Sequence, residues 1–352
     1  MKRHVPLLLA VLLVGLSALL LSVAEGPRPA SARAEVDFPR WLREPEAERL
    51  QARRTLAPVP APAAAPEAEE EPPRPRDPFL VALPRDPQKP LVVLEANALR
   101  HSRLGELFVE CLLRRPGRDP FEEARREAGI DPLKDIDRVA FAQDGMILFG
   151  FFDRAQLAAL EAESRVTRRG EQGLVYEPLR ATGPAMSLGT WRRELIVAGE
   201  PAFVEATLDR LEGRSAGTPA LIPERLTYGE AYGVVPGAAL ANLFRGEQAE
   251  LGRRIASAAS RIELHADAMR DVAVVANVSG ADERAVEELG TALGAAIAVG
   301  RIQALAGGSS QVAELLEHAR VVRGAGGGFS LELALPVEVL ERWFAGCGTA
   351  QP

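Results

Sequence analysis

The sequence contains little of the chemistry that metal centres and nucleic-acid surfaces require. Of 352 residues only two are cysteine and four are histidine, and aromatic residues make up 5%. The histidines are scattered, and none has the spacing of a zinc-binding pair; they are His4, His101, His265 and His318. Positive charge is not in excess, because 42 Lys and Arg stand against 49 Asp and Glu, for a net charge of -7. The sequence therefore predicts no metal site, no nucleic-acid partner and no general attraction to anionic lipid.

Motifs for catalysis and for cofactor binding are missing as well. No G-x-S-x-G motif occurs, and neither cysteine has a histidine nearby in the sequence. The glycine run from Gly324 to Gly328 leads into an expected strand, whereas a phosphate loop must lead into a helix, so we predict a hairpin turn there. The acidic run from Gly129 to Asp137 lacks the alternating ligands of a calcium loop. We predict no catalytic residue and no cofactor.

Residues 1-24 read as a membrane-targeting segment. Lys2 and Arg3 precede an uncharged apolar run from Val5 to Ala24. Twenty helical residues span about 30 Å, the hydrocarbon thickness of a bilayer. Because the basic residues precede the run, the rest of the chain is expected on the far side of the membrane. We therefore predict that the chain contacts the membrane through this helix.

Two interpretations of this segment remain open. The run is longer than a typical signal-peptide core, which favours an uncleaved anchor in a bacterial inner membrane, with a single pass and the body in the periplasm. Small residues at Ser22-Val23-Ala24, and again at Ala30-Ser31-Ala32, also permit cleavage, which near Ala24 would give a secreted or periplasmic protein.

Residues 25-89 are rich in Pro, Ala and Glu, as in the stretch from Ala57 to Pro62. Such a composition does not bury a core, and Pro-rich chain extends by about 3.1 Å per residue. We predict a disordered linker that holds the body away from the membrane. A short tail, residues 348-352, is expected at the other end.

The body reads as two α+β units, residues 90-216 and residues 217-347. Each is expected to contain a strand, helices, a hairpin, a helix, further strands and a terminal helix, which suggests tandem similar units. In the first unit Asp144-Gly145 predicts a hairpin turn, and a helix is expected from Pro201 to Leu211. In the second a long helix is expected from Asp282 to Leu305. We predict antiparallel strands with helices packed on one face.

Two local patterns concern packing. Gly290 and Gly294 form a small-xxx-small pair in a stretch too short to span a bilayer, so we predict close packing of this helix on the sheet. Cys111 continues a helical face with Leu107 and Phe108, and Cys347 lies on a second apolar face. The two cysteines are interpreted as buried thiols or, alternatively, as one disulfide that joins the first helix to the last.

Three stretches carry a resemblance. Gly129 to Val139, Gly150 to Arg154 and Leu195 to Gly199 resemble a recurrent pattern in exported or membrane-anchored bacterial protein families of unknown function. The resemblance implies tandem α+β modules outside the cytoplasm and carries no catalytic residue across. The long Pro-rich spacer departs from that pattern.

These observations favour a non-enzymatic, membrane-tethered envelope protein that acts as a binding or scaffolding module, with an envelope protein as a possible partner. One alternative is an envelope hydrolase whose site is assembled from distant residues. Another is an inner-membrane component of a secretion or pilus machine. A pocket with convergent ionisable groups of perturbed pKa would favour the enzyme, whereas a shallow apolar patch would favour binding.

Overall fold

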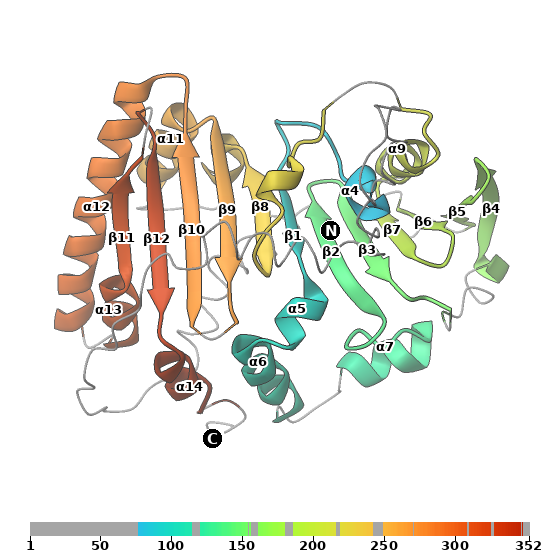
Figure 1. The fold of residues 1–352 in the computed structure, drawn as a ribbon, viewed down its shortest axis with the longest axis horizontal. Helices are drawn as coiled ribbons and strands as arrows, with labels where there is room; N and C mark the ends of the chain where they lie inside the picture. The colour runs from blue at the N-terminus through green and yellow to red at the C-terminus, as the bar shows by residue number, and fades with distance from the viewer. Residues whose placement is uncertain are drawn as a thin grey trace, which may run out of the picture.

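The computed structural model describes residues 77–114, 120–153, 155, 161–179, 186–215, 219–241, 249–269, 271–307, 310–324, 327–345 and 347. The expected N-terminal hydrophobic helix, most of the expected linker and the expected tail lie outside these residues. The described residues form an α+β fold built on one large antiparallel sheet (Figure 1).

The first half contains seven strands and five helices among the described residues. The strands are β1 (Leu91–Leu94), β2 (Ile136–Ala142), β3 (Gly145–Gly150), β4 (Ser164–Arg169), β5 (Gly173–Pro178), β6 (Ser187–Trp191) and β7 (Leu195–Gly199). The helices are α4 (Pro78–Ala82), α5 (Ala96–Arg100), α6 (Arg103–Arg114), α7 (Pro120–Ala128) and α9 (Pro201–Leu211).

The second half contains five strands and six helical segments among the described residues. The strands are β8 (Ala231–Val235), β9 (Arg261–Asp267), β10 (Val272–Ser279), β11 (Ala319–Arg323) and β12 (Phe329–Leu335). The helices are the 3-10 turn η2 (Glu224–Leu226), α10 (Gly237–Ala241), α11 (Ala249–Ala258), α12 (Glu283–Ala306), α13 (Ser310–Glu317) and α14 (Val337–Ala345).

The strands of both halves join in a single sheet of twelve strands. Their order is β11-β12-β10-β9-β8-β1-β2-β3-β7-β6-β5-β4. The junction is the antiparallel pair β1 and β8, in which Val93 lies opposite Tyr232. The predicted hairpin at Asp144-Gly145 is confirmed, with Gly145 paired to Ala142. The free edges, β4 and β11, both carry arginines, and charged edge strands resist unwanted pairing with other chains.

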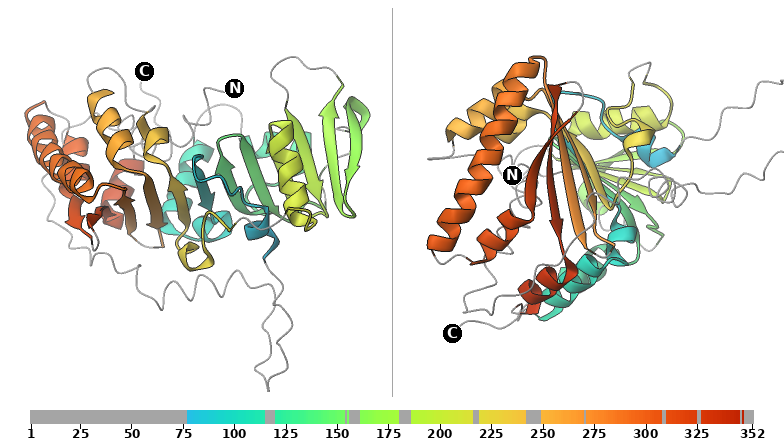
Figure 2. Two further views of the ribbon diagram at one scale, coloured as in Figure 1. Left: turned by 90° about the horizontal axis from the view of Figure 1, so that it is seen from above. Right: turned by 60° about the vertical axis from the view of Figure 1, so that its left-hand side comes forward.

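Helices cover both faces of the sheet, so the expectation of helices on one face is wrong. Val234 packs with α4 and α9, whereas its neighbour Val235 packs with α10. Consecutive strand residues point to opposite faces, so α4 and α9 lie on one side and α10 on the other. The same alternation places α11, α12 and α14 with α10, as the right-hand view of Figure 2 shows for α12.

The folded region begins at residue 77, inside the segment that the sequence predicts as linker, residues 25–89. Asp77 caps α4 by accepting a hydrogen bond from the Phe79 N–H at 2.9 Å, and Phe79 is fully buried. Asp77 also forms an ion pair with the buried Arg138, whose guanidinium lies 4.6 Å from the Phe79 ring and 4.4 Å from the Phe149 ring. This segment is therefore part of the core.

The two cysteines form a disulfide, which was the second of the two alternatives. Their α-carbons lie 5.3 Å apart and their sequence separation is 236 residues. Both are buried in a cluster between α6 and α14 that includes Leu107 and Trp343. The predicted buried position of Phe108 is wrong, since its side chain is 42% exposed. The bond thus joins a helix of the first half to the end of the second.

Candidate contact surface

Helix α12 is the longest helix among the described residues, and its start is well determined. The Asp282 side chain accepts hydrogen bonds from the backbone N–H groups of Arg284 and Ala285, at 3.0 and 3.2 Å. Such N-capping satisfies donors that have no partner within the helix. Alanine and leucine, both strong helix formers, recur through its length. The helix lies along the edge of the sheet beside β11 (Figure 1).

The inner face of α12 packs closely on the sheet, as predicted for Gly290 and Gly294. A Cβ atom on Gly290 would lie 2.9 Å from the Phe329 ring, and one on Gly294 would lie 3.9 Å from Val321. Further along, a Cβ on Gly300 would lie 3.2 Å from Leu316 of α13. The glycines therefore let the helix backbone approach its neighbours, and the inner face is already occupied.

The outer face of α12 changes character along the helix. Its first half carries Arg284 and Glu288, which form an exposed ion pair at 3.1 Å. No charged residue follows until Arg301. The last turns carry exposed apolar residues, which we call the outer strip: Ala295, Ala298, Val299, Ile302, Leu305 and Ala306. Arg301 and Gln303, in the same turns, are exposed as well. The exposed fractions of Val299, Ile302 and Leu305 are 52%, 65% and 63%.

This exposure is unusual for a helix of such composition. Within the part of the chain that the structure describes, α12 is the one helix long and apolar enough to cross a membrane, with a mean hydropathy of 1.4 in its most apolar window. Only 17% of that window is buried in the protein. Helices that are apolar on all sides are normally buried, in protein or in lipid. The outer strip thus lacks a covering within the described fold.

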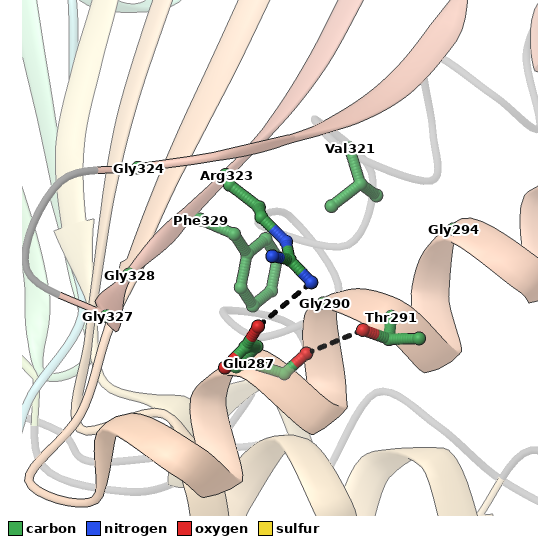
Figure 3. Close-up of a pocket in the computed structure, with 10 residues that line it drawn as sticks. All are labelled: Glu287, Gly290, Thr291, Gly294, Val321, Arg323, Gly324, Gly327, Gly328 and Phe329. Atoms are coloured by element: carbon green, nitrogen blue, oxygen red, sulfur yellow. Dashed lines mark hydrogen bonds and ion pairs between the residues drawn. The ribbon is translucent and has the colours of Figure 1, made fainter.

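A shallow cavity of about 330 Å³ opens between α12 and the β11–β12 hairpin (Figure 3). Glycines from both elements line it, together with Phe329 and Val321. Arg323 reaches across it to Glu287 at 2.9 Å, and the Thr291 hydroxyl donates to the Glu287 carbonyl at 3.0 Å. The cation and the carboxylate in the lining therefore neutralise each other. The glycine run is a hairpin turn, as predicted, because β11 and β12 pair on either side of it.

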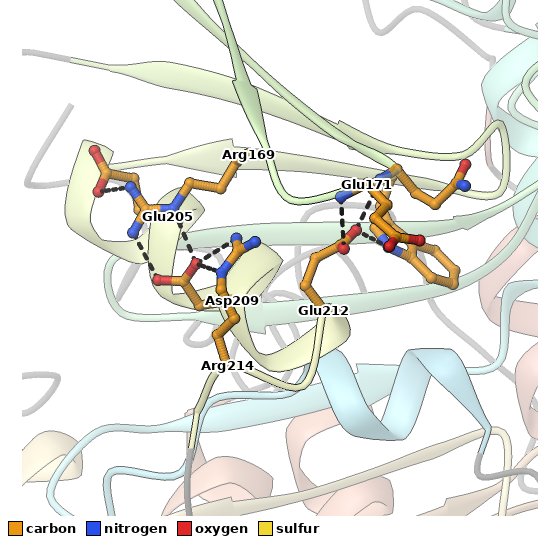
Figure 4. Close-up of polar contacts among 8 residues, drawn as sticks. Arg169, Glu171, Glu205, Asp209, Glu212 and Arg214 are labelled. Atoms are coloured by element: carbon orange, nitrogen blue, oxygen red, sulfur yellow. Dashed lines mark hydrogen bonds and ion pairs between the residues drawn. The ribbon is translucent and has the colours of Figure 1, made fainter.

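The charged cluster around α9 is a structural network (Figure 4). Arg169 of β4 donates to both Asp209 oxygens, at 2.9 and 2.6 Å, and to Glu205 at 2.6 Å. These hydrogen bonds from Arg169 lower the pKa of Asp209 to about 2, with Arg214 adding to the effect. Glu212 accepts from the N–H groups of the β4–β5 turn and from Trp191. The network fastens an edge hairpin to α9 through matched charges.

A second polar group lies buried at the centre of the sheet. The Tyr232 hydroxyl donates to Glu95 at 2.9 Å, and the Ala268 N–H donates to Glu230 at 2.8 Å. The Tyr228 and His265 rings stack with centroids 4.0 Å apart. Burial lowers the pKa of His265 to about 4 and raises that of Tyr228 to about 12. His265 and Glu230 are each only 1% exposed, so the group lies inside the fold and not in an open pocket.

The remaining sequence expectations can be placed on the structure. His265 is buried, whereas His101 is an exposed residue at the end of α5. Among the described residues, no group of three His, Cys, Asp or Glu side chains is arranged to hold a metal ion. In the acidic run, Gly129 has a φ of 66° and ends α7, and Asp135 accepts from the Asp131 N–H at 2.7 Å. The run is therefore a helix end, a turn and the start of β2.

The outer strip is not predicted from the sequence, although the lack of charge in this part of the helix indicates it. The segment from Leu289 to Gly300 is too short to span a membrane, and its length alone therefore gives no sign of the strip. The informative feature is that these twelve positions carry no charge on any side of the helix. A helix that is apolar on the face opposite its buried one is normally covered on both faces, by protein or by lipid.

No protein-family model matches the chain, and no curated protein matches it. Among solved structures, crystal form I of TP0453 is similar at a TM-score of 0.37 and 11% identity, over 76% of this chain and 96% of that one. A likeness of this size carries no argument about function.

Proposed function

We propose that this protein is a non-enzymatic, membrane-tethered module of the bacterial envelope that binds another envelope component through the outer strip of α12. The observation that carries the proposal is the exposed apolar surface at Val299, Ile302 and Leu305. A contiguous apolar surface that is exposed to solvent marks a site of contact with a protein, a membrane or a ligand. The inner face of the same helix is fixed on the sheet, which gives the strip a rigid support.

The tether is inferred from the sequence. Lys2 and Arg3 before the apolar run from Val5 to Ala24 favour insertion with the remainder of the chain in the periplasm, either anchored by a single pass or released near Ala24. The Pro-rich stretch supplies reach. A tether also raises the effective concentration of the body near its target, so a weak contact suffices.

The disulfide supports the same compartment. Disulfides persist in oxidising compartments such as the periplasm and are rare in the cytosol. The bond between Cys111 and Cys347 closes a loop that contains the second half and most of the first half of the body. Loop closure of this length constrains the unfolded chain strongly, which would stabilise the body by roughly 2–5 kcal/mol.

We further infer that the two halves are tandem similar units. Counted outwards from the central pair, the strand orders are β1-β2-β3-β7-β6 and β8-β9-β10-β12-β11. In both, the last strand in sequence pairs with the second strand of a hairpin and leads into a helix, α9 or α14. The β4–β5 hairpin is then an addition to the first unit.

The hydrolase alternative has weaker support. Enzymes place groups of perturbed pKa in an accessible pocket. Here the groups with the largest changes lie inside the fold, as His265 does, or in a matched ion network, as Asp209 does. The cavity beside α12 offers one ion pair and a glycine lining.

A test of the proposal is photo-crosslinking in cells that express the full chain. A photoreactive amino acid replaces Val299 or Ile302 in the outer strip, with Arg284 and Glu288 as matched positions on the polar half of the same face. We expect covalent adducts in the membrane fraction from the strip positions, severalfold above those from the polar positions. Equal yields from all four positions, or adducts only from the polar half, would contradict a binding role for the strip.

A further inference from the structure

We propose that the component bound by the outer strip is a lipid bilayer, whose interfacial layer the last three turns of α12 enter. This inference rests on the proposed binding role and names the partner. It follows from three features of the strip: its size, its chemistry and the change of polarity along the helix.

The size of the strip fits lipid better than protein. Six residues form it, whereas a stable protein interface uses about 20–30 residues a side and buries about 800 Å² on each partner. A hydrocarbon layer needs no complementary shape, because burial of apolar surface is favourable without direction. A small apolar strip can therefore gain from lipid where it could not hold a protein alone.

The chemistry of the strip points the same way. Protein contact sites derive most of their affinity from Trp, Tyr and Arg anchors. The strip contains only alanine, valine, isoleucine and leucine, and no aromatic residue occurs anywhere in α12. Valine, isoleucine and leucine are among the side chains that partition most readily into hydrocarbon. A uniform aliphatic surface is suited to a fluid partner.

The change of polarity along α12 determines how deep it enters. The strip, from Ala295 to Ala306, rises about 18 Å, well short of the roughly 30 Å hydrocarbon layer, and the exposed Arg301 lies within the same turns. The inner face stays bound to β12 and α13, so the helix cannot leave the body and span. The polar half, with Arg284 and Glu288, remains in water while the strip enters the boundary of headgroups and acyl chains, about 5–10 Å deep.

Attraction between charges has little part in this insertion. The chain has a net charge of -7, Arg284 on the outer face is paired with Glu288, and the exposed Arg301 is the one basic residue in the last three turns of α12. Interfacial helices that depend on anionic lipid carry a face rich in Lys and Arg, which α12 lacks. Binding should therefore proceed on zwitterionic lipid and persist at high salt.

The test uses the full chain reconstituted in phosphatidylcholine vesicles. An environment-sensitive NBD probe is attached at Val299→Cys, with Arg284→Cys as the matched exposed position on the polar half of the same face. Labelling without reductant leaves the Cys111–Cys347 bond closed. Because the readout is local to the probe, the N-terminal apolar run does not confuse it.

We expect the probe at position 299 to emit at shorter wavelength, to be quenched by nitroxide-labelled lipid and to be protected from iodide. The probe at position 284 should show the reverse. Raising the salt concentration should leave both results unchanged. Adding Ile302→Asp and Leu305→Asp should reduce lipid quenching at position 299 at least severalfold, while the circular dichroism spectrum stays native.

Other results would overturn the inference. Quenching at position 299 by iodide and not by labelled lipid would show that the strip stays in water. Protection from both quenchers would show that α12 contacts protein, such as a second copy, which refutes lipid while leaving a binding role intact. Should the double variant lose its native spectrum, a probe at Ile302→Cys supplies an independent reading. Failure of the proposed function itself would appear separately, as the absence of strip adducts in cells.

Discussion

Helices α9 and α12 pack on opposite faces of the same sheet, and their solvent-facing sides differ: that of α9 is charged, and that of the end of α12 is apolar. Each buries an inner face against strands, through Val204 and Leu208 in α9 and through Val286 and Leu289 in α12. The outer side of α9 carries Glu205 and Asp209 in a network of ion pairs. The end of α12 instead presents the aliphatic outer strip.

The difference shows which features serve the fold and which do not. Both inner faces obey the same packing rule, so each is explained by the stability of the sheet. The charges of α9 are explained too, because they attach the β4–β5 hairpin. Nothing in the described fold uses the outer strip, and exposing it to water costs free energy. The strip is therefore where a role outside the fold is best sought.

The largest effect should come from the buried side of α9. Leu208 is fully buried in the main core cluster, so Leu208→Ala should lower the free energy of unfolding by about 2–5 kcal/mol through lost burial and a residual cavity. Urea denaturation of the full chain in detergent measures it. A matched Leu305→Ala change in the outer strip should cost less than about 0.5 kcal/mol. Equal losses would break the comparison, since they would mean that Leu305 is covered.

A smaller, pH-dependent effect should separate the outer sides of the two helices. Asp209 has its pKa lowered from 3.8 to about 2, so its ion pairs stabilise the fold above pH 3.8 and lose that contribution as the pH falls towards 2. Arg169 and Arg214 are 34% and 40% exposed, and solvent screening reduces the expected contribution to about 1 kcal/mol.

Asp209→Asn should therefore destabilise the protein at neutral pH, and its difference from the wild type should shrink as the pH falls from 3.8 to 2 and vanish below pH 2. Denaturation curves across that range measure it. The control is Glu288→Gln, which removes the exposed ion pair on α12 and should change little at any pH. A constant deficit for Asp209→Asn down to pH 2 would show that the network acts through packing and not through charge.

Local patterns in the sequence determined much of the fold. The boundaries of α9 at Pro201 and Leu211 were predicted correctly, and so were the hairpin at Gly145 and the course of α12. In each case a proline, a turn residue or a helix cap coincides with a change of hydrophobic period. Such signals depend on neighbours in sequence, so a single chain suffices to interpret them.

Elements held by distant partners were missed. Strand β4 is a free edge with four exposed positions, so it has no alternating apolar pattern. Helix α4 lies in Pro-rich chain, and its place in the core depends on Arg138, which is 61 residues away from Asp77. The outer strip was missed for a related reason, because exposure on one side of a helix depends on the whole fold.

The smallest change in stability should come from Ile302→Ser, which should also weaken contact between the outer strip and lipid. Ile302→Ser replaces a side chain that is 65% exposed, so the free energy of unfolding should change by less than about 0.5 kcal/mol. The same change removes an aliphatic group from the centre of the strip, so lipid quenching of a probe at position 299 should fall. Leu289→Ser, on the buried face of the same helix, is the matched contrast and should destabilise the fold strongly. A stable Ile302→Ser variant with undiminished quenching would mean that the exposed surface of α12 does not serve as its contact, and the comparison with α9 would then concern stability alone.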